Sequence, residues 1–216
     1  DPSTSITFSK GTTKAGYTWK NWNSKADGTG TNLGTGDTYV SSDRTGDISV
    51  YACYDLITYN ITYNLNGGTN PNNAQTSYNV TTATFDLPTP SKTGYTFAGW
   101  FDNEELTGTA VTEIKKGSYG DKTFYAKWVA GAHTLTFKVN GEVYKTIAAE
   151  YDQAIVLPEN PANYEANGYT YTFTKWAEYT DGMTVTGDKE FNAVFTATPI
   201  TYTVTLKNGE EVETID

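Results

Sequence analysis

Histidine, cysteine, methionine and arginine are almost absent from this sequence of 216 residues, which contains one of each: His133, Cys53, Met183 and Arg44. One cysteine cannot form an internal disulfide, and one histidine with one cysteine cannot build a zinc site of the usual composition. A Ser-His-Asp or Cys-His catalytic arrangement would have to use the single histidine. We therefore expect no enzyme, no catalytic residues, no metal ion and no cofactor.

Positive charge and long apolar runs are also scarce. Fifteen Lys and Arg residues oppose 25 Asp and Glu residues, which gives a formal net charge of −10. Binding to nucleic acid requires clustered Lys and Arg to neutralise phosphates, so this balance argues against a nucleic-acid partner. No segment reaches the roughly 18–20 apolar residues of a membrane span, so we expect no direct membrane insertion.

Threonine and aromatic residues are abundant instead. The sequence contains 39 Thr and 17 Tyr, and aromatic residues make up 14% of it. Threonine and tyrosine fit a pleated, half-exposed surface and therefore favour β-strands. A chain this rich in aromatic residues can bury enough apolar area to fold, which argues against disorder.

A Tyr-Thr-aromatic-x-x-Trp pattern occurs three times, in Tyr17–Trp22, Tyr95–Trp100 and Tyr171–Trp176. Spacings of 78 and 76 residues separate its tryptophans. Segments that open and close each unit keep the same order around it. The closing segments are 48–54, 122–128 and 189–195, and the opening segments are 61–67, 135–141 and 202–209. An internal repeat of this length indicates tandem small domains.

The repeat divides the chain into four parts. Residues 58–128 and 133–197 are complete repeats, 1–56 is the second half of a repeat, and 200–216 is the opening hairpin of a truncated one. The links between these parts are short, so we expect neighbouring repeats to touch and to form an elongated array.

Alternation of apolar and polar residues predicts half-buried strands in most segments. Leu135, Phe137 and Val139, for example, are expected to share one face of a strand. Asn-Gly between alternating segments predicts hairpins, because both residues tolerate positive φ. We also expect one short helix per repeat, near Tyr78–Leu87 or Tyr151–Leu157, which gives a mainly β fold of the α+β type.

At this point the repeat resembles a known family. Gly94–Phe101, followed by Lys122–Trp128, strongly resembles the Listeria–Bacteroides repeat, a family that includes the internalin B-type repeats. Ile61–Gly68 and Gly117–Gly120 fit the same family. The resemblance implies a β-grasp-like unit in a bacterial surface protein, located extracellularly at the cell surface or wall. It implies no catalytic residues.

The three copies depart from one another at one glycine. Gly99 in the middle copy is replaced by Asn21 in the first copy and by Lys175 in the third. We therefore expect that the backbone at this position does not depend on glycine in every copy.

Tryptophan and tyrosine supply the candidate structural and binding residues. Trp22, Trp100 and Trp176 could stack on sugars, but their fixed place in a strand favours structural anchors, with Tyr17, Tyr95 and Tyr171 in the same role. Trp19 and Trp128 do not occur in every copy, which makes them the better candidates for surface-binding aromatics.

Other candidate sites have a simpler interpretation. The Asp27–Asn32 loop could bind Ca²⁺, but its spacing matches no EF-hand loop, so we interpret it as a solvated loop. Asp102, Glu104 and Glu105 are adjacent acids in one loop, whereas glycosidase carboxylates come from separate elements. Cys53 has no histidine near it in sequence, and no lysine occupies a core-facing position in every copy, as a Lys–Asn isopeptide bond would require.

The leading hypothesis is a stalk or spacer that projects another domain from a bacterial cell. The alternative is an adhesin-type module that recognises a host protein or glycan through exposed aromatics or a sheet edge. Neighbouring repeats of the same protein are the other expected partners. Because the sequence starts at Asp1 and has no signal peptide, we expect a fragment or processed product of a longer secreted protein.

Overall fold

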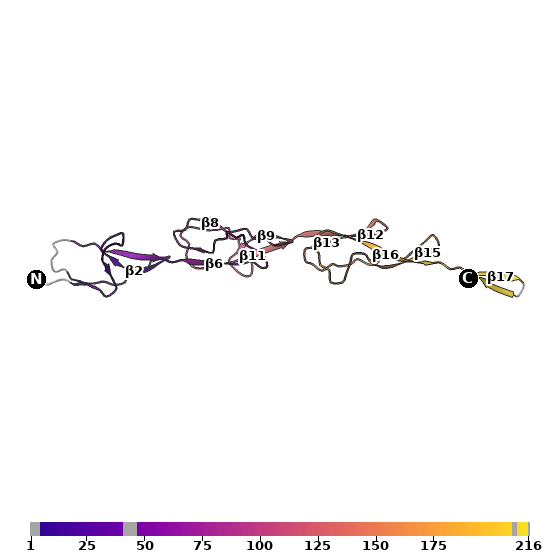
Figure 1. Ribbon diagram of the computed structural model, residues 1–216, viewed down its shortest axis with the longest axis horizontal. Helices are drawn as coiled ribbons and strands as arrows, with labels where there is room; N and C mark the ends of the chain where they lie inside the picture. Colours follow the sequence, from indigo (N-terminus) through magenta and orange to yellow (C-terminus); the bar gives the residue numbers. More distant parts are fainter. Residues whose placement is uncertain (1–4, 41–46, 209–210, 216) are drawn as a thin grey trace. The chain divides into compact units, whose positions relative to one another are not determined.

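The computed structural model describes residues 5–40, 47–208 and 211–215 (Figure 1), and the side chains of residues 7–37 and 47–205 among them. Every regular element in these ranges is a β-strand, which confirms the mainly β class. Because the described residues contain no helix, none of them forms a helix that is long and apolar enough to cross a membrane.

The expected short helix is wrong in both candidate segments. In Tyr78–Leu87, Asn79 Oδ1 accepts hydrogen bonds from the backbone N–H of Thr81 at 2.9 Å and from its hydroxyl at 2.7 Å. This local turn competes with helix formation. The segment then enters strand β8, Phe85–Asp86, where β-branched threonines precede an aromatic residue.

In Tyr151–Leu157 the backbone is held by another segment. Asp152 has a left-handed φ of 66°, which a helix cannot accommodate. Ala154 forms an isolated bridge with Thr184, and the N–H of Ile155 donates to the carbonyl of Met183 at 3.1 Å. The segment is therefore an extended loop whose backbone forms hydrogen bonds with residues 183–185.

Internal contacts divide the chain into two compact units. The first comprises Asp1–Thr93 and Phe97–Trp128, and the second comprises Gly94–Thr96 and Val129–Asp216. The four-part division suggested by the repeats stays a prediction.

Residues 58–128, called the 58–128 repeat below, form a four-stranded mixed sheet. Its order is β7-β6-β11-β9, made of Ser77–Tyr78, Tyr59–Asn64, Lys122–Ala130 and Tyr95–Phe101. The two central strands run parallel, with Ile61 opposite Lys122. A separate antiparallel pair is formed by β8, which precedes β9 in the sequence, and β10 (Glu113–Ile114), which follows β9.

Residues 133–197, called the 133–197 repeat below, form a five-stranded sheet with the same central order. The order is β13-β12-β16-β15-β14, made of Glu142–Glu150, Ala132–Val139, Lys189–Pro199, Tyr169–Trp176 and Tyr164–Ala166. Strands β12 and β16 again run parallel, with Leu135 opposite Lys189. In both repeats the opening and closing strands are therefore direct neighbours. A β-grasp-like classification stays a prediction.

The remaining strands belong to the ends of the chain. In the 1–56 segment, β2 (Tyr17–Asn23) pairs with β3 (Asn32–Leu33) and with β5 (Tyr51–Leu56), and β1 (Ser5–Thr7) pairs with β4 (Thr38–Val40). Near the C-terminus, β17 (Val204–Asn208) and β18 (Glu211–Ile215) form a separate antiparallel pair.

Three Asn-Gly pairs in the described residues form turns but lead to different structures. Asn167 and Gly168, with φ of 53° and 80°, connect β14 directly to β15. Asn140 and Gly141, with φ of 51° and 87°, connect β12 directly to β13, as the sequence predicts. Asn66 and Gly67 have similar φ values of 47° and 84°. There, however, the chain continues into a loop, and β7 begins only at Ser77.

Each repeat encloses its own buried apolar cluster, and the two clusters share no residue. The 58–128 cluster consists of Ile61, Tyr78, Leu87, Trp100, Ile114, Phe124 and Ala126. The 133–197 cluster consists of Leu135, Phe137, Ile155, Trp176, Val185 and Phe191. Leu135 and Phe137 are buried as the alternation predicts, and Val139 packs against the same cluster.

Replacing Phe191 by alanine should destabilise the 133–197 repeat by about 3–5 kcal/mol, because it leaves a large cavity. Phe191 is 0% exposed and stacks on Phe137 with ring centres 5.1 Å apart. Thermal or denaturant unfolding of the full chain measures the loss. Tyr202→Ala is the control, since Tyr202 is 73% exposed and its removal should change stability by less than about 0.5 kcal/mol. Equal effects of the two substitutions would contradict the assignment of the core.

Candidate functional site

The Tyr-Thr-aromatic-x-x-Trp pattern lies on strands β2, β9 and β15. Regular alternation would place residues three positions apart on opposite faces of a strand. The pairing register shifts between Trp19 and Asn21 in β2, and between Phe173 and Lys175 in β15. Such a bulge inserts one residue, so the aromatic residue and the tryptophan can face the same side.

Ring contacts show the result of this arrangement. Phe173 and Trp176 have ring centres 5.4 Å apart, and Phe97 and Trp100 have the same separation. These tilted and edge-on geometries are favourable for aromatic pairs. In the second and third copies, the three-residue spacing of the pattern therefore produces an aromatic pair on the core side of the sheet.

The three repeat tryptophans differ in burial and in hydrogen bonding. Trp100 and Trp176 are each 2% exposed, whereas Trp22 is half-buried. The indole N–H of Trp100 donates to the carbonyl of Pro88, and that of Trp22 donates to the carbonyl of Ser9, both at 2.7 Å. The indole nitrogen of Trp176 is buried without a hydrogen-bond partner. Their role as structural anchors stays a prediction that this burial supports.

The repeat tyrosines are all half-buried, and each contacts another tyrosine. Tyr17 meets Tyr54 edge-on at 6.3 Å, and the ammonium of Lys14 lies 4.1 Å from the centre of the Tyr17 ring. Tyr171 stacks on Tyr164 at 4.8 Å. The third member, Tyr95, meets Tyr151 edge-on at 5.6 Å.

Trp19 and Trp128, the two candidate surface-binding aromatics, are half-buried as well. Trp128 packs beside Phe97 with ring centres 5.4 Å apart, and its indole N–H donates to the carbonyl of Leu65 at 2.9 Å. The indole nitrogen of Trp19 is buried without a hydrogen-bond partner, close to Gly11. Binding of a partner by either residue stays a prediction.

The expectation about Gly99 is confirmed. Gly99 has a φ of 123°, and a Cβ there would meet the Cβ of Ala110 at 2.9 Å. Asn21 and Lys175 occupy the same place in the pattern, yet neither has a positive φ. Glycine is therefore required by the local backbone in the 58–128 repeat alone.

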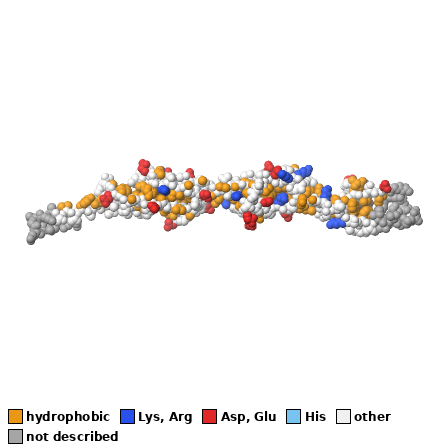
Figure 2. All heavy atoms as spheres, turned by 180° about the vertical axis from the view of Figure 1, so that it is seen from behind, with side chains coloured by type: hydrophobic (Ala, Val, Ile, Leu, Met, Phe, Trp, Pro, Cys, Tyr) orange, Lys and Arg blue, Asp and Glu red, His pale blue; other side chains and the backbone are white. Residues whose placement is uncertain are grey.

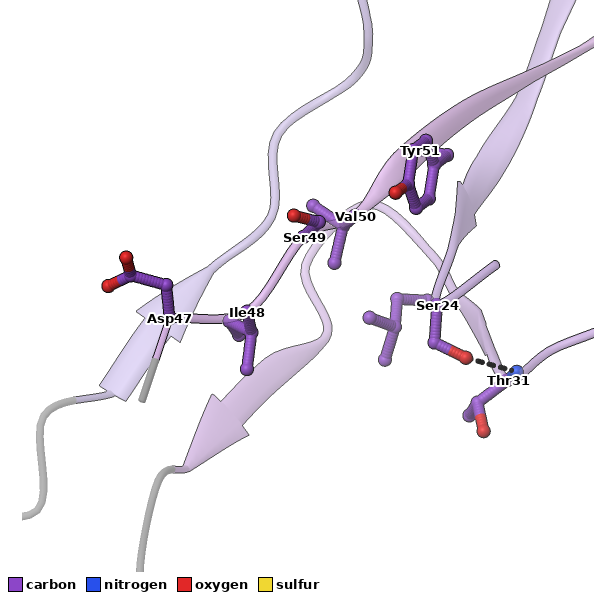
Figure 3. A pocket seen from close by; sticks show the side chains of 8 residues that line it. Ser24, Thr31, Asp47, Ile48, Ser49, Val50 and Tyr51 are labelled. Carbon is purple, nitrogen blue, oxygen red and sulfur yellow. Dashed lines mark hydrogen bonds between the residues drawn. The ribbon is translucent and has the colours of Figure 1, made fainter. Parts of the chain in front are cut away.

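A surface hollow of about 370 Å³ lies in the 1–56 segment (Figure 3). It is lined by Ser24, Thr31, Leu33, Asp47, Ile48, Ser49, Val50 and Tyr51. The backbone N–H of Thr31 donates to the hydroxyl of Ser24 across it at 2.9 Å. Asp47 is its one carboxylate, and the lining contains no imidazole or thiol, so these residues do not form an acid–base pair.

A second hollow of about 380 Å³ in the 58–128 repeat gathers more charge. Its charged lining residues are Asp102, Glu113, Lys115, Asp121 and Lys122. Glu113 and Lys115 lie 3.7 Å apart, which partly neutralises the acids. The neighbouring Glu104 and Glu105 are exposed. Within the described ranges, no three His, Cys, Asp or Glu side chains are grouped so that they could hold a metal ion.

Asn23 is the one buried polar residue among the described side chains and was missed by the sequence analysis. Its side-chain amide donates to the carbonyls of Gly28 and Gly30 and to Asn32 Oδ1, at 2.7–3.2 Å. Its Oδ1 accepts the N–H groups of Lys25 and Gly30. The residue thus holds the whole 24–32 loop, which includes the loop weighed above as a Ca²⁺ site.

The acid of that loop is engaged in a turn. Asp27 Oδ1 accepts hydrogen bonds from the backbone N–H of Thr29 at 2.9 Å and from its hydroxyl at 2.7 Å. These bonds, the backbone one foremost, lower the pKa of Asp27 below its ordinary value. Since a hydrogen-bonded carboxylate oriented toward its own turn is typical of an Asx-turn, this geometry supports a structural role for Asp27.

A repeated Gly-Asp pair precedes each closing strand and was also missed. It occurs as Gly46-Asp47, Gly120-Asp121 and Gly187-Asp188. Asp121 Oδ1 accepts the N–H of Asn60 at 2.8 Å, and Asp188 Oδ1 accepts the N–H of Thr134 at 2.9 Å. Asp121 and Asp188 therefore each connect the beginning of the closing strand to the beginning of the opening strand. The signal was visible in the sequence as a dipeptide at the same place in three copies.

Replacing Asn23 by alanine should destabilise the 1–56 segment by about 1–3 kcal/mol, because buried donors and acceptors of the loop lose their partner. Unfolding followed by tryptophan fluorescence measures the loss. Asn103→Ala is the control, since Asn103 also bridges its loop, through Thr107, but at an exposed site. We expect at most about 0.5 kcal/mol for the control. A smaller effect at Asn23 than at Asn103 would overturn this interpretation.

Replacing Asp188 by asparagine should lower the melting temperature at neutral pH and have a vanishing effect in acid. The N–H of Thr134, and secondarily the imidazole of His133, lower the pKa of Asp188 below its ordinary value. A carboxylate with a lowered pKa stabilises the fold above its unfolded pKa, and this contribution is lost as pH falls through the folded pKa. Melting curves of both proteins between pH 7 and about pH 2 measure it. A difference between them that is independent of pH would count against the charged hydrogen bond.

Comparison with known proteins connects these features to a family. The sequence model of the Listeria-Bacteroides repeat domain matches residues 1–53, 59–127 and 133–206. A putative Gly-rich membrane protein of Evansella cellulosilytica is 30% identical over 212 residues, which cover 94% of this chain and 23% of the relative. Internalin H of Listeria monocytogenes is 31% identical over 117 residues, which cover 50% of this chain and 20% of that protein.

The chain thus spans about a fifth of the length of these relatives. No solved structure matches it. The repeat model covers most of the described strands, including the three motif strands and both parallel strand pairs. The chain belongs to the Listeria-Bacteroides repeat domain family.

Proposed function

We propose that the chain is a non-enzymatic, extracellular repeat segment of a bacterial cell-surface protein, and that it acts as a spacer projecting another domain. The names of its relatives support the location: one is an internalin and two are described as putative membrane proteins. Family membership supports a tandem repeat rather than a single enzyme domain.

The parallel pairing of opening and closing strands carries the mechanical part of the proposal. In the 58–128 repeat the chain enters along β6 and leaves along β11, and residues from Ile61 to Asn64 pair with residues from Lys122 to Tyr125. Since the strands are parallel, entry and exit lie at opposite ends of the pair. Tension along the chain therefore shears these hydrogen bonds together instead of opening them one by one. Strands β12 and β16 repeat this geometry.

The charge distribution suits an exposed spacer. Lys and Arg side chains on the face shown in Figure 2 are dispersed among acidic ones and do not gather in one patch. Together with the net charge of −10, this supports a soluble segment without a nucleic-acid partner. It equally disfavours binding to anionic lipid.

The surroundings of the single histidine support the non-enzymatic assignment. His133 contacts Asp188 at 3.3 Å, and Asp188 is already used by the backbone N–H of Thr134. The side chain of Asp188 is 78% exposed, so the pair is not enclosed in a water-excluding cleft. Catalysis by a His-carboxylate pair requires a nucleophile within hydrogen-bond reach and an enclosed site.

Adhesion is the alternative, and exposed aromatic residues favour it. Tyr119, Tyr169 and Tyr202 are 61%, 42% and 73% exposed. Exposed tyrosines supply apolar contact area with a polar end, which suits protein and glycan surfaces. A glycan array and a pull-down from host-cell extracts separate the two functions: saturable binding that is lost on replacing these tyrosines supports adhesion, and two blank results support the spacer.

Single-molecule stretching tests the spacer. Pulled from its termini, each complete repeat should unfold in one high-force step and release roughly 200 Å or more of chain, from ~3.4 Å per residue. The control is a Cys53→Ser variant with handles at Thr62→Cys and Thr123→Cys, which face each other on β6 and β11. Pulling there opens the strands one bond at a time, so the 58–128 repeat should yield at clearly lower force.

Equal unfolding forces in the two pulling geometries would contradict the proposal that the β6–β11 pair resists tension along the chain. Small-angle scattering adds a second test of the spacer. A radius of gyration near the roughly 17 Å expected for one compact domain of this length would also contradict it.

A further inference from the structure

We propose that the glycine of the turn before a motif strand is a docking point for one side chain from the repeat that follows. Gly16 receives Val80 and Gly94 receives Tyr151, whereas the third turn glycine, Gly168, has no docked side chain in the described part of the chain. Docking would couple the stability of neighbouring repeats. This inference does not depend on the spacer function, because a coupled array could equally serve adhesion.

The glycines of the three turns share nearly the same φ and one hydrogen bond, although Asn167, before Gly168, also has a positive φ of 53°. Gly16, Gly94 and Gly168 have φ values of 79°, 77° and 80°. The carbonyl of each accepts a backbone N–H from the residue that follows the closing strand: Ile57 at 3.0 Å, Gly131 at 2.8 Å and Ile200 at 2.8 Å. Each turn therefore lies against the point where the chain leaves the repeat.

The first docking contact lies inside the first compact unit. A Cβ on Gly16 would collide with the side chain of Val80, and all three nearest atoms belong to that side chain. Val80 follows strand β7, which pairs with the opening strand β6. It therefore comes from the edge of the 58–128 repeat, whereas Gly16 belongs to the 1–56 segment.

The second contact lies inside the second compact unit, which contains Gly94–Thr96. A Cβ on Gly94 would collide with the ring of Tyr151, and its three nearest atoms are all ring carbons. Tyr151 follows β13, the strand that pairs with the opening strand β12. The N–H of Tyr151 donates to the carbonyl of Gly131 at 2.8 Å, and the N–H of Gly131 donates to the carbonyl of Gly94. Rings of Tyr95 and His133 flank Tyr151 at 5.6 and 6.3 Å.

The third turn has the same φ without an occupant. Nothing lies within 4 Å of a Cβ built on Gly168 in the part of the chain that the structure describes. Strands β17 and β18, which follow it, pair with each other. Gly168 therefore provides an internal reference for what a turn glycine contributes without a docked side chain.

The comparison of turns separates two requirements for glycine. A φ near +80° disfavours any side chain, whether or not the turn is docked. The collision with Val80 or Tyr151 adds a second requirement at Gly16 and Gly94. The docked side chains differ in chemistry but come from the same place, one or two residues beyond the strand that pairs with the opening strand.

A hydrogen-exchange experiment on the full chain tests the coupling from the docking side. Val80→Ala should raise the amide exchange rate of residues 14–23 by about fivefold or more, although no residue of that segment has changed. Ser77→Ala is the matched control, since Ser77 is an exposed residue of the same strand, and it should leave residues 14–23 unchanged. Unaltered exchange of residues 14–23 in Val80→Ala would falsify the proposal.

A pair of glycine substitutions tests the same contact from the other side. Gly16→Ala and Gly168→Ala introduce the same methyl group at nearly equal φ, so they share the backbone strain. We expect Gly16→Ala to lower the melting temperature by at least about 5 °C more than Gly168→Ala. Adding Val80→Ala to Gly16→Ala should recover part of that excess, because it makes room for the new Cβ. Two results together would overturn the docking contact. Gly16→Ala and Gly168→Ala would lower the melting temperature equally, and the effects of Gly16→Ala and Val80→Ala would be additive in the double variant.

Discussion

The parallel pairing of the opening and closing strands constrains the rest of each repeat. Parallel neighbours cannot be joined by a tight turn and need a long crossover, which in most proteins contains a helix. Here the crossover between β6 and β11 contains only short strands and loops, including β8, β9 and β10. Without a helix to cover the sheet, the crossover must supply the core with side chains from loops, and Leu87 and Ile114 do so.

Large aromatic rings make such a loop-covered core possible. A repeat of this size buries little apolar area unless each core residue contributes much of it. The bulge in the motif strand brings a second ring to the core side, beside the tryptophan. In the 133–197 repeat, the rings of Phe137, Phe173 and Tyr144 lie 5.0, 5.4 and 6.0 Å from that of the nearly inaccessible Trp176, and Phe191 stacks on Phe137. The aromatic excess of the sequence thus suits repeats whose described residues form sheets covered by loops.

Strands were predictable from the sequence because alternation is a local property. The buried positions Leu135 and Phe137 and the turn at Asn140-Gly141 follow from it directly. Local alternation could not exclude the expected helix near Tyr151–Leu157, since the hydrogen bonds that keep this segment extended come from residues about 30 positions away. The candidate site residues were still less predictable from local patterns. Asn23 has no counterpart in the other copies, which carry Phe101 and Ala177 at that place in the pattern.

The turn glycines show that the same residue at the same place in a repeat can have different structural roles. Glycine at Gly168 is explained by its φ alone, so the presence of glycine does not identify a docked turn. The docking side chain does identify it, but valine and tyrosine share no sequence signal, because the contact requires only apolar surface beside a residue without Cβ. Position relative to the opening strand is what Val80 and Tyr151 have in common. Docking between repeats of this kind is therefore recognised from strand pairing, and the glycine indicates only where such a contact is possible.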